Sequence, residues 1–150
     1  MLYLNKSDQE PDNLSEVTVY QNPFWIAENS SIIVRAEIPN IESAMWITDT
    51  GLAGTAFVMG STAAEDAGSL PLGGKPVTGV GGGGIVKGKP VLLPELKLGA
   101  LDLNNVKGIS LQSFPLEDRF GFRVAGLLSC EYFQNSVLAL DFSSLTLTVS

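Results

Sequence analysis

The fold of this chain is decided by Met45–Phe57, which reads Met-Trp-Ile-Thr-Asp-Thr-Gly-Leu-Ala-Gly-Thr-Ala-Phe. Its first residues are aromatic and β-branched, a composition that favours a pleated, half-buried strand. Asp49 stands where this strand breaks into a tight loop, and Gly51 can adopt backbone angles that other residues avoid. A carboxylate at the end of a buried strand is a candidate for chemistry. The structural alternative is an Asp that only opens a β-turn.

The composition predicts one compact globular domain and excludes several kinds of site. The 150 residues are 45% hydrophobic, the net charge is −7, and His is absent. A chain of this length can bury a core without disulfides or metals. The negative charge argues against nucleic acid as a partner, and no apolar run approaches the ~20 residues that span a bilayer. Because His is absent, the chain cannot form a Ser-His-Asp or Cys-His catalytic arrangement, and it cannot form a His-based metal site. No cofactor is expected.

Two further features bear on domain organisation. Residues 1–30 are predicted to be an N-terminal extension or linker, with a possible short strand at Val17–Tyr20 and a turn at 21–23. Residues 31–150 then form the domain. The single cysteine, Cys130, cannot make an internal disulfide, and its apolar neighbours predict a small core residue.

The remaining pattern indicates many short strands. Ser31–Ile38 alternates apolar residues on one face, and the next strand runs through to Thr48. Two alternating runs at the end of the chain predict a terminal hairpin. Further strands are expected at Thr55–Met59, Val91–Leu93, Leu96–Leu98 and Ile109–Leu111. Two helical segments are expected, at Ser61–Ser69 and at Gly126–Gln134.

The glycine-rich stretch Gly79–Gly84 formally matches the dinucleotide-binding pattern G-x-G-x-x-G. That pattern requires a helix directly after it, whose N-terminus faces the pyrophosphate. The residues that follow, Ile-Val-Lys-Gly-Lys-Pro, do not predict one. A glycine-rich β-turn, either a plain loop or a mobile flap over a site, is the favoured interpretation.

Paired carboxylates are the remaining route to acid–base chemistry in a chain without His. Glu65-Asp66 and Glu117-Asp118 lie in polar segments and are expected to be solvated, and Asp141 is expected to be structural. Only Asp49 has a strand before it and a glycine after it. One carboxylate cannot act on water as both acid and base, so a second copy is needed, which a C2 dimer with Asp49 beside its axis would supply.

Taken together, these landmarks resemble the retropepsin-like aspartyl protease family, in particular its bacterial single-domain members. The resemblance covers Ser31 to Val149, and Asp-Thr-Gly gains specificity from the segments that follow it at the expected spacing. The matching segments are Trp46–Thr55, Gly79–Gly84, Gly126–Phe133, Val137–Phe142 and Leu145–Leu147.

The resemblance implies a mainly β, closed acid-protease barrel with one short C-terminal helix, active as a homodimer. Asp49 of each protomer would form the catalytic dyad that activates water against a peptide carbonyl, and Thr50 would brace the two loops. Gly51 would let the substrate backbone approach, and the glycine-rich stretch would be the flap. The implied substrate-binding residues are Gly51, Ala53, Gly81, Gly82 and Gly83. The partner is a peptide or protein, and a cytoplasmic and a periplasmic location both stay open.

Three residues differ from the family's usual ones. Leu52 and Ala53 replace a small residue and a Ser or Asp after Asp-Thr-Gly, and Ser129 replaces a glycine. They motivate an alternative hypothesis, in which the chain is a catalytically weak or inactive module of the same fold that binds peptides or dimerises. A glycan-acting enzyme with two carboxylates in one chain is a third possibility, but it lacks an identifiable partner for Asp49.

Overall fold

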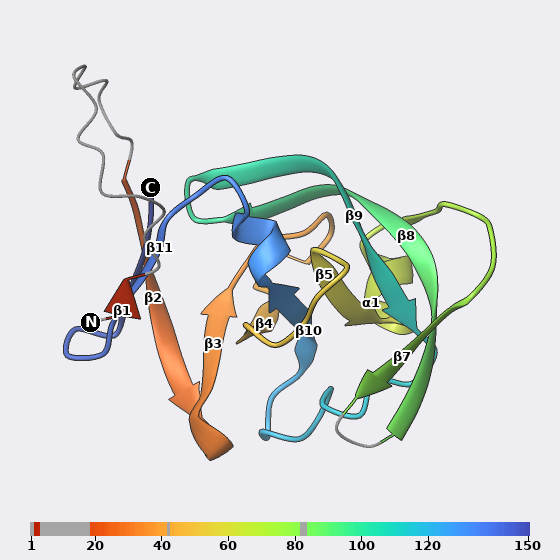
Figure 1. The fold of residues 1–150 in the computed structure, drawn as a ribbon, viewed down its shortest axis with the longest axis horizontal. Coiled ribbons are helices and arrows are strands. Elements are labelled where there is room, and N and C mark those ends of the chain that lie inside the picture. The colour runs from red at the N-terminus through yellow and green to blue at the C-terminus, as the bar shows by residue number, and fades with distance from the viewer. Residues whose placement is uncertain (1, 4–18, 42, 82–83) are drawn as a thin grey trace.

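The protein is described by a computed structural model that covers residues 2–3, 19–41, 43–81 and 84–150. It is mainly β, as the sequence predicts (Figure 1). The strands are β1 Leu2–Tyr3, β2 Tyr20–Ala27, β3 Ser31–Arg35, β4 Met45–Asp49, β5 Phe57–Gly60, β6 Leu70–Pro71, β7 Val77–Gly81, β8 Gly84–Leu98, β9 Leu101–Leu111, β10 Val124–Ser129, β11 Leu138–Asp141 and β12 Thr146–Val149. The helix α1 spans Ser61–Asp66, and two 3-10 turns, η1 and η2, span Glu28–Ser30 and Cys130–Phe133.

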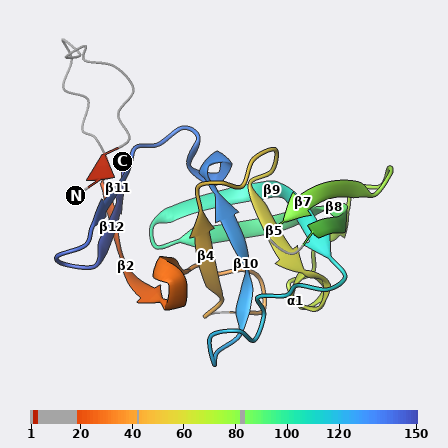
Figure 2. The same ribbon diagram turned by 60° about the horizontal axis from the view of Figure 1, so that its bottom comes forward.

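The strands pair in the order β1-β11-β12-β2-β3-β4-β10-β5-β9-β8-β6, and β7 pairs with β8. The group β1, β11, β12 and β2 lies at one end of the molecule, and the β7–β8 hairpin lies at the other (Figures 1 and 2). Among the described residues this path has two free ends, β1 and β6, so the closed barrel that the sequence predicted is not confirmed. In the described ranges, no helix is long and apolar enough to cross a membrane.

The core lies on both faces of the strands that lead to Asp49. Trp46 is fully buried in the larger apolar cluster, where its ring meets Phe57 edge-on at 6.1 Å and its indole N–H donates to Ala36 O at 3.2 Å. Ile47, the next residue, belongs to a second cluster together with Ile33. Because successive side chains of a strand point to opposite faces, β4 is buried on both sides and its end is fixed in place.

The helix predicted over Gly126–Gln134 is wrong for most of its length. The segment is β10 up to Ser129, and only the single 3-10 turn η2 follows. The reason is tertiary: a Cβ at Gly126 would lie 2.2 Å from Val58 O, so only glycine allows β10 to pass this close to β5. A short apolar run such as Leu127-Leu128 has no periodicity that separates a buried strand from a helix.

The expected turn at 21–23 is also wrong, because these residues lie inside β2. This strand pairs with β12 through Tyr20–Pro23 and with β3 through Phe24–Ala27, so it is an inner strand of the sheet. Residues Val17 and Thr18 of the predicted short strand lie outside the described ranges. Cys130 is exposed rather than buried, because η2 turns its side chain away from the core.

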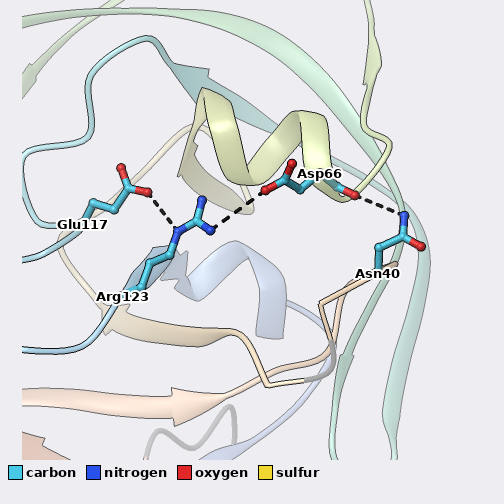
Figure 3. A network of polar contacts seen from close by, with 4 residues as sticks. All are labelled: Asn40, Asp66, Glu117 and Arg123. Atoms are coloured by element: carbon cyan, nitrogen blue, oxygen red, sulfur yellow. Dashed lines mark hydrogen bonds and ion pairs between the residues drawn. The ribbon is translucent and has the colours of Figure 1, made fainter.

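Other predicted elements are confirmed or extended. The helical turn expected within Ser61–Ser69 is α1, and the terminal hairpin is the antiparallel pair β11–β12. The short strands expected between residues 91 and 111 are parts of a long antiparallel pair, β8 and β9. Figure 3 shows how polar contacts brace α1: Arg123 bonds Glu117 at 2.9 Å and approaches Asp66 at 3.9 Å, and the Asn40 amide donates to Asp66 O at 3.1 Å.

Candidate functional site

Asp49 ends β4 in the middle of the sheet. β4 and β10 run side by side in the same direction (Figure 2), and their register places Ser129 opposite Asp49. The carboxyl ends of two parallel strands therefore meet at the aspartate. β10 also pairs with β5, the strand after the Asp49 loop, so both ends of the loop are attached to one strand.

The Asp49 carboxylate is half-buried and is bonded within its own loop. Its Oδ1 accepts the Gly51 N–H at 2.8 Å. A Cβ at Gly51 would lie 3.3 Å from this same oxygen, so a larger residue here would press against the carboxylate. The unusual backbone angles that the sequence predicted at Gly51 occur instead at Gly54, where φ is +84°.

The far side of the loop is held by the end of β10 and the start of η2. The Ser129 hydroxyl is fully buried and bonds the carbonyl oxygens of Thr55 and Ala56, and it accepts the Glu131 N–H at 3.0 Å. The Glu131 carboxylate accepts the Gly54 N–H at 2.6 Å. The loop between β4 and β5 is thus tied to the chain 77 residues further on.

Glu131 is a site residue that the sequence did not single out. A glutamate in a short apolar segment has the appearance of an ordinary exposed helix residue. Nothing in the local pattern indicates that its carboxylate reaches a loop so far away in the chain. The only signal was Ser129, which stands two residues earlier where the resembled family has glycine.

The other residues implied at the loop are placed as follows. Thr50 and Ala53 are exposed. Leu52 is half-buried and packs against the second cluster, and its N–H donates to Asp49 O at 3.4 Å. The bulk of Leu52 is therefore directed toward the interior of the chain, while Thr50 faces solvent.

The glycine-rich stretch forms the hairpin of β7 and β8 rather than a nucleotide loop, since a strand follows it and not a helix. Val80 and Ile85 pair across the hairpin and are 89% and 75% exposed. Val86 packs instead against the second cluster, as Leu52 does. Gly81 lies near the tip, whereas Gly82 and Gly83 lie outside the described residues.

An apolar groove of about 540 Å³ lies along the same side of the sheet as Asp49. Met45 at its edge is four residues before Asp49, and alternate residues of a strand share a face. Phe120 and Phe122 stack at 5.9 Å on one wall, and the Arg35 guanidinium lies 5.6 Å from the Trp25 ring centroid on the other.

The other acidic residues that the sequence singled out are either exposed or take part in structural contacts. Glu65 and Asp66 are exposed on α1, Asp118 is exposed, and Glu117 bonds Arg123. Asp141 accepts bonds from Ser143 and Ser144, above all from the Ser143 hydroxyl at 2.6 Å, which lowers its pKa to about 2. Within the described ranges, no group of three or more His, Cys, Asp or Glu side chains could hold a metal ion.

Comparison with known proteins supports the fold and only the fold. No model of a protein family matches the sequence, and no curated protein sequence matches it. Among solved structures, a retropepsin-like aspartic protease from Rickettsia conorii superposes with a TM-score of 0.60 and 15% sequence identity. The similarity covers 88% of this chain and 91% of that one. The chain therefore has a retropepsin-like fold.

Proposed function

We propose that the protein is an aspartic endopeptidase that works as a homodimer, with one Asp49 from each protomer. The observation that carries this proposal is the position of Asp49, half-buried at the end of β4 beside β10, in a chain with the retropepsin-like fold. One protomer offers a single such carboxylate among its described residues. The exposed Thr50 beside it provides a polar contact for the second copy.

The chemistry follows from two close carboxylates. Two carboxyl groups that lie close together cannot both be ionised. The two aspartates of an aspartic-protease dyad are known to share one proton. The ionised Asp49 takes a proton from water, whose oxygen attacks the peptide carbonyl carbon. The protonated Asp49 donates its proton to the carbonyl oxygen, which gives a neutral tetrahedral diol. When the C–N bond breaks, a proton passes to the leaving nitrogen and the second hydroxyl proton returns to the dyad.

The substrate would lie between the Asp49 loop and the β7–β8 hairpin. Gly51, Ala53 and the hairpin glycines, from Gly81 to Gly83, would contact its backbone, and the apolar groove beside Met45 would take side chains further along. The hairpin face that carries Val86 is turned toward the cluster on which Leu52 packs, and this face would close over a peptide. These features support an unfolded protein or an extended peptide as the substrate.

The decisive experiment measures cleavage of an unfolded protein substrate from pH 3 to pH 7 by the wild type and by Asp49→Asn. The wild type is expected to show a bell-shaped profile, because one carboxylate must be ionised and the other protonated. The variant should keep the wild-type circular dichroism spectrum and lose cleavage. A wild type that cleaves nothing in this range contradicts the proposal.

A second candidate function is a non-catalytic peptide-binding or dimerisation module of the same fold. It is favoured by Ala53, which is exposed but has no side-chain group to hydrogen-bond a substrate. Calorimetric titration with an extended peptide separates the two functions. Binding without turnover by the wild type would favour the module, whereas turnover that Asp49→Asn removes would favour the peptidase.

A further inference from the structure

The structure assigns to Glu131, with Ser129, the role of positioning residues that hold the Asp49 loop from the opposite strand. For its catalytic consequence this inference rests on the proposed function, but the order of the loop can be measured without activity. The carboxylate of Glu131 holds the tip of the Asp49 loop, and the hydroxyl of Ser129 holds the segment in which the loop returns to β5.

The loop needs such support because its own bonds fix only its beginning. The Gly51 N–H is bonded to the Asp49 side chain, whereas Gly54, at φ +84°, donates its N–H to the carboxylate of Glu131. The Gly54 nitrogen lies 2.6 Å from the carboxylate oxygen of Glu131, which is a close hydrogen bond. The glutamate thus holds the turn that leads the chain away from the catalytic carboxylate.

Ser129 couples this bond to the sheet. Its hydroxyl accepts the Glu131 N–H, which fixes the start of η2 and the direction in which the glutamate side chain leaves the backbone. The same hydroxyl bonds the Thr55 and Ala56 carbonyl oxygens, and the Ser129 N–H also donates to Ala56 O at 3.0 Å. The serine that replaces the family's glycine therefore fills its site with hydrogen bonds and does not displace the loop.

A displacement of a reacting group by about 1 Å can cost about 100-fold in rate, so loss of this support should appear in kcat. We therefore compare Glu131→Ala, Glu131→Gln and the control Glu95→Ala, an exposed glutamate on β8. For each variant, kcat and KM for a peptide, the melting temperature and the amide hydrogen exchange rate of Gly54 are measured. Glu131→Gln keeps an acceptor oxygen, whereas Glu131→Ala removes it.

Glu131→Ala should lower kcat at least tenfold with KM within twofold, and should speed exchange at Gly54 at least tenfold. Glu131→Gln should recover kcat to within threefold of the wild type, and Glu95→Ala should match the wild type. An unchanged kcat in Glu131→Ala, or a Glu131→Gln variant as impaired as Glu131→Ala, overturns the inference. Ser129→Ala keeps the backbone N–H and should also lower kcat, but by a smaller factor than Glu131→Ala does.

The outcome is separable from the fate of the proposed function. If the wild type hydrolyses no peptide, the peptidase proposal fails, and the exchange rate of the Gly54 amide still decides whether Glu131 holds the loop. Faster exchange in Glu131→Ala with an unchanged melting temperature supports the positioning role. Unchanged exchange at Gly54 refutes it, whether or not the wild type is active.

Discussion

Ser129 lies opposite Asp49 in the parallel ladder between β10 and β4, although the two residues are eighty positions apart in the sequence. This pairing places the proposed catalytic carboxylate and a fully buried hydroxyl at the same level of the sheet. It also means that the support of the site and the site itself come from different parts of the chain.

Under the proposed dimeric mechanism, activity should depend on protein concentration, because each active site would need Asp49 from two protomers. Specific activity should fall on dilution in parallel with the dimer fraction measured by sedimentation. In an equal mixture of wild type and Asp49→Asn, random pairing leaves about one quarter of the dimers with two aspartates. Activity per wild-type chain should therefore fall to about half; a full retention of activity would indicate that one protomer suffices.

Replacing Val77 by serine should raise KM for an extended peptide about fivefold, because Val77 lies on the hairpin face that carries Val86 and would face the proposed substrate. The free energy of unfolding should change by less than about 0.5 kcal/mol, because Val77 is 38% exposed. Val80→Ser, on the opposite face of the same hairpin, is the control and should leave KM unchanged. An unaltered KM in Val77→Ser would contradict the role of the hairpin as a flap.

Gly126→Ala should destabilise the protein by at least about 2 kcal/mol, because the new methyl group overlaps the backbone of β5 and forces two strands apart. Urea unfolding gives the measurement. The matched control is Gly79→Ala, whose Cβ would meet only Val86 at 3.7 Å and should change stability by less than about 0.5 kcal/mol. Equal stability of the two variants would contradict the close packing of β10 on β5.

Asp141 should titrate in the folded protein with a pKa of about 2, below its ordinary 3.8, because the Ser143 hydroxyl and nearby N–H groups favour the ionised form. Its contribution to stability is complete above the unfolded-state pKa and is lost as the pH falls from about 4 toward 2. An NMR titration of the side chain measures the value. Asp141→Asn should flatten the pH dependence of stability in this window, and a titration near 4 would contradict the bonds described.

Sequence patterns sufficed where the structure depends on neighbouring residues. The strand before Asp49 is aromatic and β-branched, and the terminal hairpin consists of two alternating runs. The helix α1 ends just before Gly68, which takes a left-handed conformation at φ +65°. They failed where distant contacts decide. Pro23 suggested a turn, yet it lies in β2 paired with Thr146, and Leu127-Leu128 became strand because β4 and β5 enclose them. The bond from Glu131 to Gly54 has no local signature at all.

The placement of β10 between β4 and β5 also sets an order of events during synthesis. Residues 45–60 emerge from the ribosome long before Val124–Ser129, the strand that must insert between them. Contacts of such sequence separation are slow to form, since a long loop must close before they contribute. The nascent chain therefore carries Asp49 without its fixed surroundings until Val124–Ser129 has also been made, 75 residues or more after Asp49.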